Sequence, residues 1–286
     1  MIFYERPVAL NRERHRTLKL DNKSGDFSFA GRTNSILLAV TELAEAAKDY
    51  PIVFAGKEGG PFTLAALVGL RDNENLFVGA DGAWQEGVYL PAFVRRYPFV
   101  LAEAESDGAD LTVCIDESYA GFNEERGDPL FGADGAETPL LEGAVKFMTL
   151  FHEEMQQTRL FAQTLADAGL LEMKSIEVNR GDQKQVLEGI FVVDQQKLAA
   201  LDDAQVLALF RSGALVAVHA HLMSLSHVER LALRMDQRMR APAKGKLEAE
   251  AEAEAPARGA PAQRPGKAGK GERADKRAAA ATSAAQ

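Results

Sequence analysis

The chain has 286 residues, a formal net charge of −9 and a single cysteine. From Ala241 onward it consists mostly of Ala, Glu, Lys, Arg, Pro and Gly, with Leu247 as the one large aliphatic residue, so this stretch lacks the apolar surface needed for a core. We therefore predict a folded domain over residues 1–240 and a disordered, Ala/Glu/Lys/Arg-rich tail over residues 241–286.

Charge is distributed unevenly between these two parts. The tail contains nine Lys or Arg and six Asp or Glu, a net charge of +3, which leaves −12 for the rest of the chain. We do not expect a domain with this net negative charge to bind nucleic acid or an anionic membrane surface. The basic run Arg258–Arg277 is a candidate for binding nucleic acid or anionic lipid, although a solvated tail is the simpler interpretation.

The sequence favours a cytoplasmic protein without a membrane span. Glu5 and Arg6 interrupt the N-terminus before a secretory apolar segment could form. The longest apolar runs, such as Phe62–Leu70, are much shorter than the roughly 20 residues of a membrane helix. The lone Cys114 excludes a disulfide within the chain and fits a reducing compartment.

The first hundred residues predict short strands, one helix and a corner. A helix is expected from Ser35 to Tyr50, and the apolar runs around it predict strands joined by short turns, hence antiparallel neighbours. The expected strands are Ile2–Tyr4, Leu18–Leu20, Phe27–Phe29, Ile52–Ala55, Phe62–Leu70 and Leu76–Val78. In the corner, Tyr89–Leu101, Pro91 starts a short helix and Pro98 ends it before a strand from Phe99.

The second half predicts hairpins and three main helices. The strand from Phe99 pairs with Leu111–Ile115 across a turn at Ser106–Asp110, and an acidic loop follows from Asp116 to Glu137. The expected helices are Thr138 to about Gly169, Asp202 to Gly213, and Ala214 to about Met239, with a hairpin of Ser175–Asn179 and Gln185–Val193 between the first two. The predicted fold class is α+β: an antiparallel, hairpin-rich sheet packed by three main helices.

Two groups of residues are candidates for a site. Cys114 and Asp116 share one face of their strand, so together with Glu117 they would form the site if the chain were an enzyme, whereas a buried, inert cysteine is the alternative. Arg95 and Arg96 lie in the corner with Tyr89 and Tyr97, where a guanidinium could pair internally or grip a carboxylate ligand. These seven residues are the predicted ligand-binding candidates.

No motif indicates a metal or a cofactor, and we predict neither. His219 and His221 point about 200° apart on a helix and cannot clasp one ion, so we interpret them, like His152, as structural histidines. The acidic loop lacks the regular alternation of a calcium loop. The glycines of Gly56–Gly60 lack the lysine and hydroxyl spacing of a phosphate loop.

Several strings resemble the SapC-like family. They are Tyr4–Asn11, Pro91–Phe99, Leu111–Glu117, Asp128–Phe131 and Gly189–Asp194, and the resemblance extends from about Tyr4 to Leu231. It implies a cytoplasmic accessory role in the export or maturation of surface-layer or outer-membrane proteins, and it supplies no catalytic residues. Because the sequence also lacks a strong catalytic motif, we predict a binding protein that holds a client polypeptide with the corner Tyr89–Leu101 and the loop Asp116–Glu137. The competing hypothesis is an enzyme of unknown reaction at Cys114, Asp116 and Glu117.

Overall fold

The computed structural model describes residues 2–21, 25–103, 111–180 and 183–253. Contacts divide the chain into Met1–Ala243 and Lys244–Gln286, and the architecture below is that of the first unit. Helix α7 (His227–Ala253) continues past residue 240, so residues 241–253 of the predicted tail are helical. The rest of that tail, including Arg258–Arg277, lies outside the described residues, and the predicted domain boundary stays a prediction.

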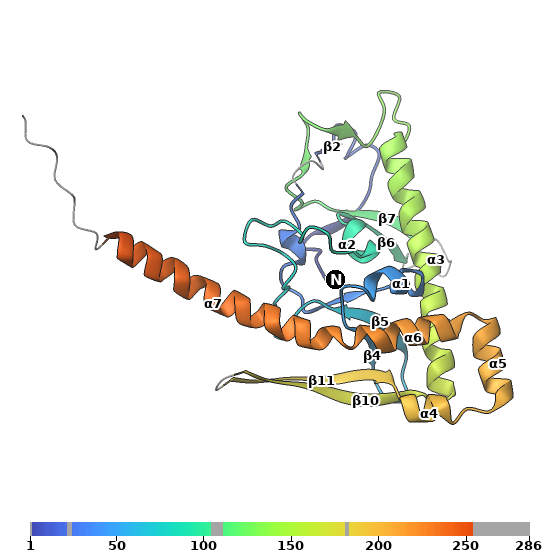
Figure 1. The fold of residues 1–286 in the computed structure, drawn as a ribbon. Helices are drawn as coiled ribbons and strands as arrows, with labels where there is room; N and C mark the ends of the chain where they lie inside the picture. The colour runs from blue at the N-terminus through green and yellow to red at the C-terminus, as the bar shows by residue number, and fades with distance from the viewer. Residues whose placement is uncertain (1, 22–24, 104–110, 181–182, 254–286) are drawn as a thin grey trace, which may run out of the picture. The chain divides into compact units, whose positions relative to one another are not determined.

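The chain has an α+β fold with antiparallel sheets, which confirms the predicted class (Figure 1). The largest sheet has five strands in the order β10-β11-β4-β5-β3. Its strands are β3 (Ser35–Leu37), β4 (Ile52–Gly56), β5 (Phe62–Leu67), β10 (Leu171–Arg180) and β11 (Gln183–Val193). The predicted β4–β5 and β10–β11 hairpins are confirmed, and β4 and β5 are almost continuously apolar because α3 and α6 cover them.

Two smaller sheets form the other end of this unit. In one, the order is β1-β7-β6, with β1 (Pro7–Ala9), β6 (Phe99–Glu103) and β7 (Leu111–Asp116); the predicted turn at Ser106–Asp110 lies outside the described residues. In the other, β2 (Lys19–Leu20) lies between β8 (Phe122–Asn123) and β9 (Asp128–Pro129). The predicted acidic loop is therefore organised by pairing with β2, which lies about a hundred residues away in sequence.

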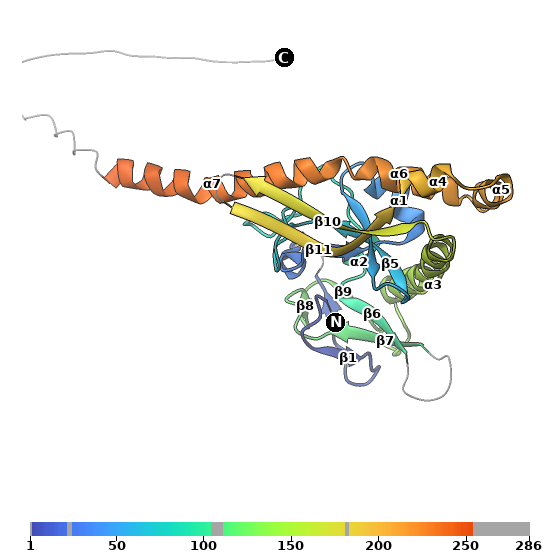
Figure 2. The same ribbon diagram turned by 90° about the horizontal axis from the view of Figure 1, so that it is seen from below.

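Helix α3 (Pro139–Asp167) links the two ends, as Figures 1 and 2 show. It contacts both β5 and β6, and one of its faces is buried and largely apolar. Leu141 and Met148 belong to the smaller hydrophobic core, whereas Phe151, Met155 and Leu165 belong to the larger one. One amphipathic helix thus serves two cores.

The predicted corner also joins these cores. Pro91 is the N-cap of α2 (Ala92–Arg95), and the Tyr97–Pro98 peptide bond is cis. Phe93 is buried in the larger core and Phe99 in the smaller one. The corner is therefore an interior segment rather than a surface loop, and only parts of its side chains reach solvent.

Four of the elements predicted for the first hundred residues differ from the structure. Ile2–Tyr4 is not a strand, and the first strand, β1, starts at Pro7. Ser35 does not cap a helix; it starts β3, and the helical residues are confined to a 3₁₀ turn (Val40–Glu42) and α1 (Leu43–Ala46). Phe27–Phe29 is not a strand, because a 3₁₀ turn occupies Ser28–Ala30. The run Leu76–Val78 forms only an isolated bridge, Val78 to Trp84. At Ser35, pairing with β5 about thirty residues away overrides the local pattern.

The C-terminal helices follow the prediction more closely. Asp202 caps α5 (Asp203–Arg211) through the amide of Gln205, and Gly213 separates it from α6 (Ala214–Ser224). The expected single helix to Met239 is wrong, since the chain breaks at Leu225–Ser226 before α7. A short helix, α4 (Gln195–Ala199), was not expected. Among the described residues no single helix could cross a membrane by length and apolarity, and the one helix pair that could, Asp203–Arg211 with Ala214–Arg240, bends by 91°.

Candidate functional site

The seven predicted site residues separate in the structure into three places. Asp116, Glu117, Tyr97 and Cys114 lie around the end of β7, and Tyr89 and Arg95 lie beside α1. Arg96 faces a pocket between β6 and α3. The side chains at the three places have different contacts. These contacts indicate at which place a ligand could bind.

Asp116 is fully buried and its carboxylate accepts five hydrogen bonds. Oδ1 accepts from the backbone amides of Arg6 (3.0 Å) and Ser118 (3.1 Å) and from Ser118 Oγ (2.6 Å). Oδ2 accepts from the amide of Glu5 (2.9 Å) and the Tyr97 hydroxyl (3.3 Å). Burial by itself would raise the pKa of this carboxyl, but the hydrogen bonds from Ser118, Glu5 and Arg6 outweigh burial and lower it. Asp116 thus holds the N-terminal segment to β7 as a carboxylate.

Glu117 makes a second set of contacts to the N-terminal segment. It accepts from His15 Nε2 (3.1 Å) and pairs with Arg14 (2.6 Å) and Arg6 (3.3 Å). Because His15 Nδ1 accepts from the Asn11 amide, Nε2 is the protonated nitrogen. The hydrogen bond from His15 and the charges of Arg14 and Arg6 lower the pKa of Glu117.

Cys114 and Tyr97 complete this cluster without adding reactivity. Cys114 lies between Ala9 and Val100 in the sheet, and burial raises the pKa of its thiol. The Tyr97 ring stacks on Phe29 with centroids 3.9 Å apart, and burial together with the nearby Asp116 raises the pKa of its hydroxyl. At neutral pH the cluster holds a protonated thiol and an ionised, fully hydrogen-bonded carboxylate, which is not a nucleophile and base pair.

Tyr89 and Arg95 meet a residue that the sequence analysis missed, Glu42. Its buried carboxylate accepts from the Ala92 amide (2.7 Å), the Tyr89 hydroxyl (2.8 Å) and the Ala39 amide (3.0 Å). Arg95 is more exposed; it lies 4.0 Å from Glu42 and donates to the Leu90 carbonyl (3.1 Å). The available signal was a glutamate within the mostly apolar run Leu38–Ala47, which also contains Thr41 and Glu45.

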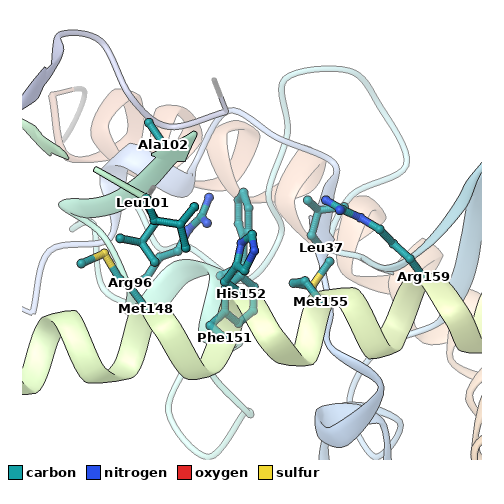
Figure 3. A pocket seen from close by; sticks show the side chains of 11 residues that line it. Leu37, Arg96, Leu101, Ala102, Met148, Phe151, His152, Met155 and Arg159 are labelled. Carbon is teal, nitrogen blue, oxygen red and sulfur yellow. The ribbon is translucent and has the colours of Figure 1, made fainter. Parts of the chain in front are cut away.

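Arg96 faces a pocket of about 450 Å³ between β6, β3 and α3, shown in Figure 3. Most of the lining is apolar: Leu37, Phe93, Leu101, Ala102, Leu111, Met148, Phe151 and Met155. The Arg96 guanidinium carbon lies 4.0 Å from the centre of the Phe93 ring and 5.4 Å from that of Phe151. These contacts hold the cation against aromatic faces.

The charge of Arg96 has no acidic partner among the described residues. Its Nε is buried and lacks a hydrogen-bond partner in the described part of the chain. Burial lowers the pKa of the guanidinium, and the ionisable group that acts against this is the Tyr4 hydroxyl. Burial raises the pKa of Tyr4 to about 12, so that hydroxyl is neutral at pH 7 and supplies no counter-charge.

Two further basic side chains line this pocket, His152 and Arg159 of α3. In Figure 3, Arg96 and Arg159 enter from opposite ends, with Phe151 and His152 between them. Sequence reasoning missed Arg159 and interpreted His152 only as structural. The signal was present, because Met148, His152, Met155 and Arg159 follow one another at the four- and three-residue spacing of a single helix face.

Comparison with known proteins gives one result. The family model described as SapC matches residues 10–231. The chain belongs to the SapC family. This confirms the predicted resemblance. No match was found among curated proteins or among solved structures.

The SapC match contains every residue that lines the pocket. Chemically, the pocket offers two guanidiniums and an imidazole within apolar walls, which suits an anion attached to an apolar group. Within the described residues, no group of three or more His, Cys, Asp or Glu could hold a metal ion. His221, one of the two histidines that invited a metal interpretation, is buried, accepts from the Val193 amide and contacts the Ile52 carbonyl through Nδ1.

Proposed function

We propose that this SapC-family chain is a cytoplasmic accessory protein that binds a client polypeptide during export or maturation of surface-layer or outer-membrane proteins. The client's site is the pocket at Arg96. One observation carries this proposal: a partly buried arginine at the wall of an apolar pocket, whose Nε is buried without a hydrogen-bond partner and whose charge has no acidic partner among the described residues.

Removing an unpaired charge from water costs free energy. A desolvated cation without a counter-charge costs on the order of several kcal/mol, and folded proteins normally pair it. A carboxylate of the client would form charge-assisted hydrogen bonds of roughly 1.5–3 kcal/mol each with the guanidinium. The apolar walls would at the same time bury the client's aliphatic or aromatic side chains.

The contacts at the end of β7 favour binding over catalysis. Asp116 and Glu117 are engaged with the N-terminal segment, and the thiol of Cys114 has a raised pKa. An enzyme with its site at these three residues remains the alternative to the proposal. It predicts that iodoacetamide modifies Cys114 rapidly at pH 7, whereas the proposal expects an inert thiol.

The test is affinity capture with a matched pair of variants. The full chain, immobilised, is expected to recover a surface-layer or outer-membrane protein from the cytoplasmic extract, and Arg96→Met is expected to reduce recovery about tenfold or more. The control is Arg95→Met, which changes the neighbouring arginine that lies beside Glu42 and outside the pocket lining.

Thermal unfolding distinguishes lost binding from lost folding. Because Arg96→Met removes an unpaired buried charge and keeps an apolar side chain, we expect a melting temperature equal to or above that of the wild type. Equal recovery by the wild type and Arg96→Met, or a large loss of stability in Arg96→Met, would contradict the proposal.

A further inference from the structure

Two sheet edges border the pocket at Arg96. In the order β1-β7-β6, β6 is an edge strand, and in the order β10-β11-β4-β5-β3, β3 is an edge strand. Leu101 of β6 and Leu37 of β3 both line the pocket. We infer that the client binds there as an extended segment that adds a strand to the free edge of β6, an inference that rests on the proposed function.

The hydrogen-bonding pattern of β7 shows which backbone groups of β6 are free. In an antiparallel ladder, alternate residues point their N–H and C=O to opposite sides of the strand. The Val113 carbonyl accepts from Leu10, towards β1, whereas the Asp116 amide donates to Pro98, towards β6. Residues 98, 100 and 102 therefore face β7. Of the residues that face away from β7, Phe99 is already engaged, since its N–H donates to the Arg96 carbonyl (2.8 Å) and its C=O accepts from the Tyr4 hydroxyl (2.7 Å). Leu101 directs its N–H and C=O away from β7.

The backbone groups of β3 alternate in the same way. The Leu38 amide donates to Leu64 (3.0 Å) and the Val68 amide donates to Asn34 (2.8 Å), so the even-numbered residues of β3 face β5. Leu37 accordingly directs its N–H and C=O away from its sheet. No hydrogen bond from the described residues reaches the backbone of Leu37 or Leu101 on the pocket side.

The free edge of β6 differs in composition from that of β10, which carries features that prevent the pairing of a further strand. Natural edge strands usually carry charges, prolines or bulges that prevent further pairing. The free edge of β10 has such protection: Lys174 pairs with Glu172 at 3.0 Å, and a bulge lies between Lys174 and Ile176. By contrast, β6 has no register shift, and its one charged residue is the last, Glu103.

These observations select an extended peptide as the occupant. A strand beside Leu101 would exchange backbone hydrogen bonds with its N–H and C=O, and alternate side chains of that strand would meet the apolar face of α3 at Phe151 and Met155. An acidic side chain or a free C-terminal carboxylate would meet Arg96 or Arg159 at the ends of the pocket (Figure 3). Backbone pairing provides affinity with little dependence on sequence, and the arginines select for negative charge.

The experiment uses a positional-scanning hexapeptide library with free C-termini, binding measured by fluorescence anisotropy with the full chain. The tightest peptide is resynthesised with a single N-methyl group at each position in turn. A peptide that pairs with β6 as a strand loses a hydrogen bond only where its methylated amide points towards β6. We therefore expect about tenfold weaker binding at alternate positions and little change at the positions between them.

A protein variant tests the same contact from the other side. Leu101→Pro removes the outward N–H without removing a ladder bond to β7, and Leu101→Ala is the control for the lost side chain. We expect Leu101→Pro to bind the peptide about tenfold more weakly than Leu101→Ala, with melting temperatures that agree closely.

The outcomes separate this inference from the proposed function. Peptide binding that depends on Arg96, but shows no alternation on N-methylation and no difference between Leu101→Pro and Leu101→Ala, overturns strand addition and leaves the client-binding proposal in place. Absence of peptide binding, together with failed capture, overturns both. Tight binding of decanoate without any peptide binding assigns the pocket to a small amphiphile and likewise overturns strand addition.

Discussion

Replacing Asp116 with asparagine tests whether this carboxylate holds the N-terminal segment to β7. The amide keeps one acceptor oxygen and replaces the other with a donor group. If the oxygen remains near Ser118, the amide of Glu5 (2.9 Å) loses its acceptor and faces another donor in a fully buried site. A hydrogen bond to a charged group contributes roughly 1.5–3 kcal/mol, and an unsatisfied buried amide costs about 1–3 kcal/mol. We expect a loss of about 3 kcal/mol in the free energy of unfolding.

The assay is urea unfolding at pH 7 with two control variants. Ser118→Ala removes only the 2.6 Å bond from Oγ, so a loss of about 1.5 kcal/mol is expected. Glu125→Gln changes an exposed carboxylate and should alter stability by less than about 0.5 kcal/mol. If Asp116→Asn costs less than 1 kcal/mol, roughly the value of one neutral hydrogen bond, the anchoring role is wrong.

The pH dependence gives a second check on the same residue. Because hydrogen bonds lower the pKa of Asp116 in the folded state, its contribution is fully present above the unfolded pKa of about 3.9 and is lost as the pH falls through the lower folded pKa. The stability difference between the wild type and Asp116→Asn should therefore be the same at pH 7 and pH 5 and should shrink below about pH 4. A difference that disappears already at pH 5 would refute the reasoning.

Two further predictions concern buried polar groups. Glu42→Gln should lower the free energy of unfolding by about 2 kcal/mol, because the Glu42 carboxylate accepts hydrogen bonds from Ala92, Tyr89 and Ala39. The control, Glu45→Gln, changes an exposed residue and should change the free energy of unfolding by less than about 0.5 kcal/mol. Equal effects of the two variants would contradict the role of Glu42. Burial lowers the pKa of His221 to about 4, so its contribution is present above the unfolded pKa of about 6.5 and is lost as the pH falls towards 4. Between pH 7 and 5 the wild type should lose about 2 kcal/mol more stability than His221→Gln in urea unfolding; parallel pH profiles would show that His221 is not buried in its neutral form.

Local sequence patterns predicted the elements whose stability depends on neighbouring residues in the chain. The long helix from Pro139, the cap at Asp202 and the hairpins β4–β5 and β10–β11 were expected and are confirmed. Ser35 was assigned to a helix because a serine followed by apolar residues also suits the start of a helix. Pairing of Ile36 with Ala66 in β5 decides the matter, and that partner is thirty residues away.

The candidate site was predicted in part for the same reason. Arg96 was singled out from the corner, and the structure shows it at a pocket wall without an acidic partner in the described part of the chain. Arg159 and Glu42 were missed because nothing near them in sequence indicates their surroundings. Asp116 and Glu117 were chosen as reactive candidates, but their partners are backbone amides and basic residues of the N-terminal segment, about a hundred positions earlier.

The sequence by itself determined the α+β class, the long helix from Pro139, the hairpins β4–β5 and β10–β11, and the SapC family, because periodicity, caps and family-specific strings are local properties of the chain. Only the tertiary structure decided which charges are paired. Hydrogen bonds satisfy Asp116 and Glu42, whereas Arg96 lies partly buried beside a pocket between two strand edges, and its Nε has no hydrogen-bond partner among the described residues. The physical reason is that burial and pairing depend on which distant segments share a core, and here α3 and the corner bring those segments together.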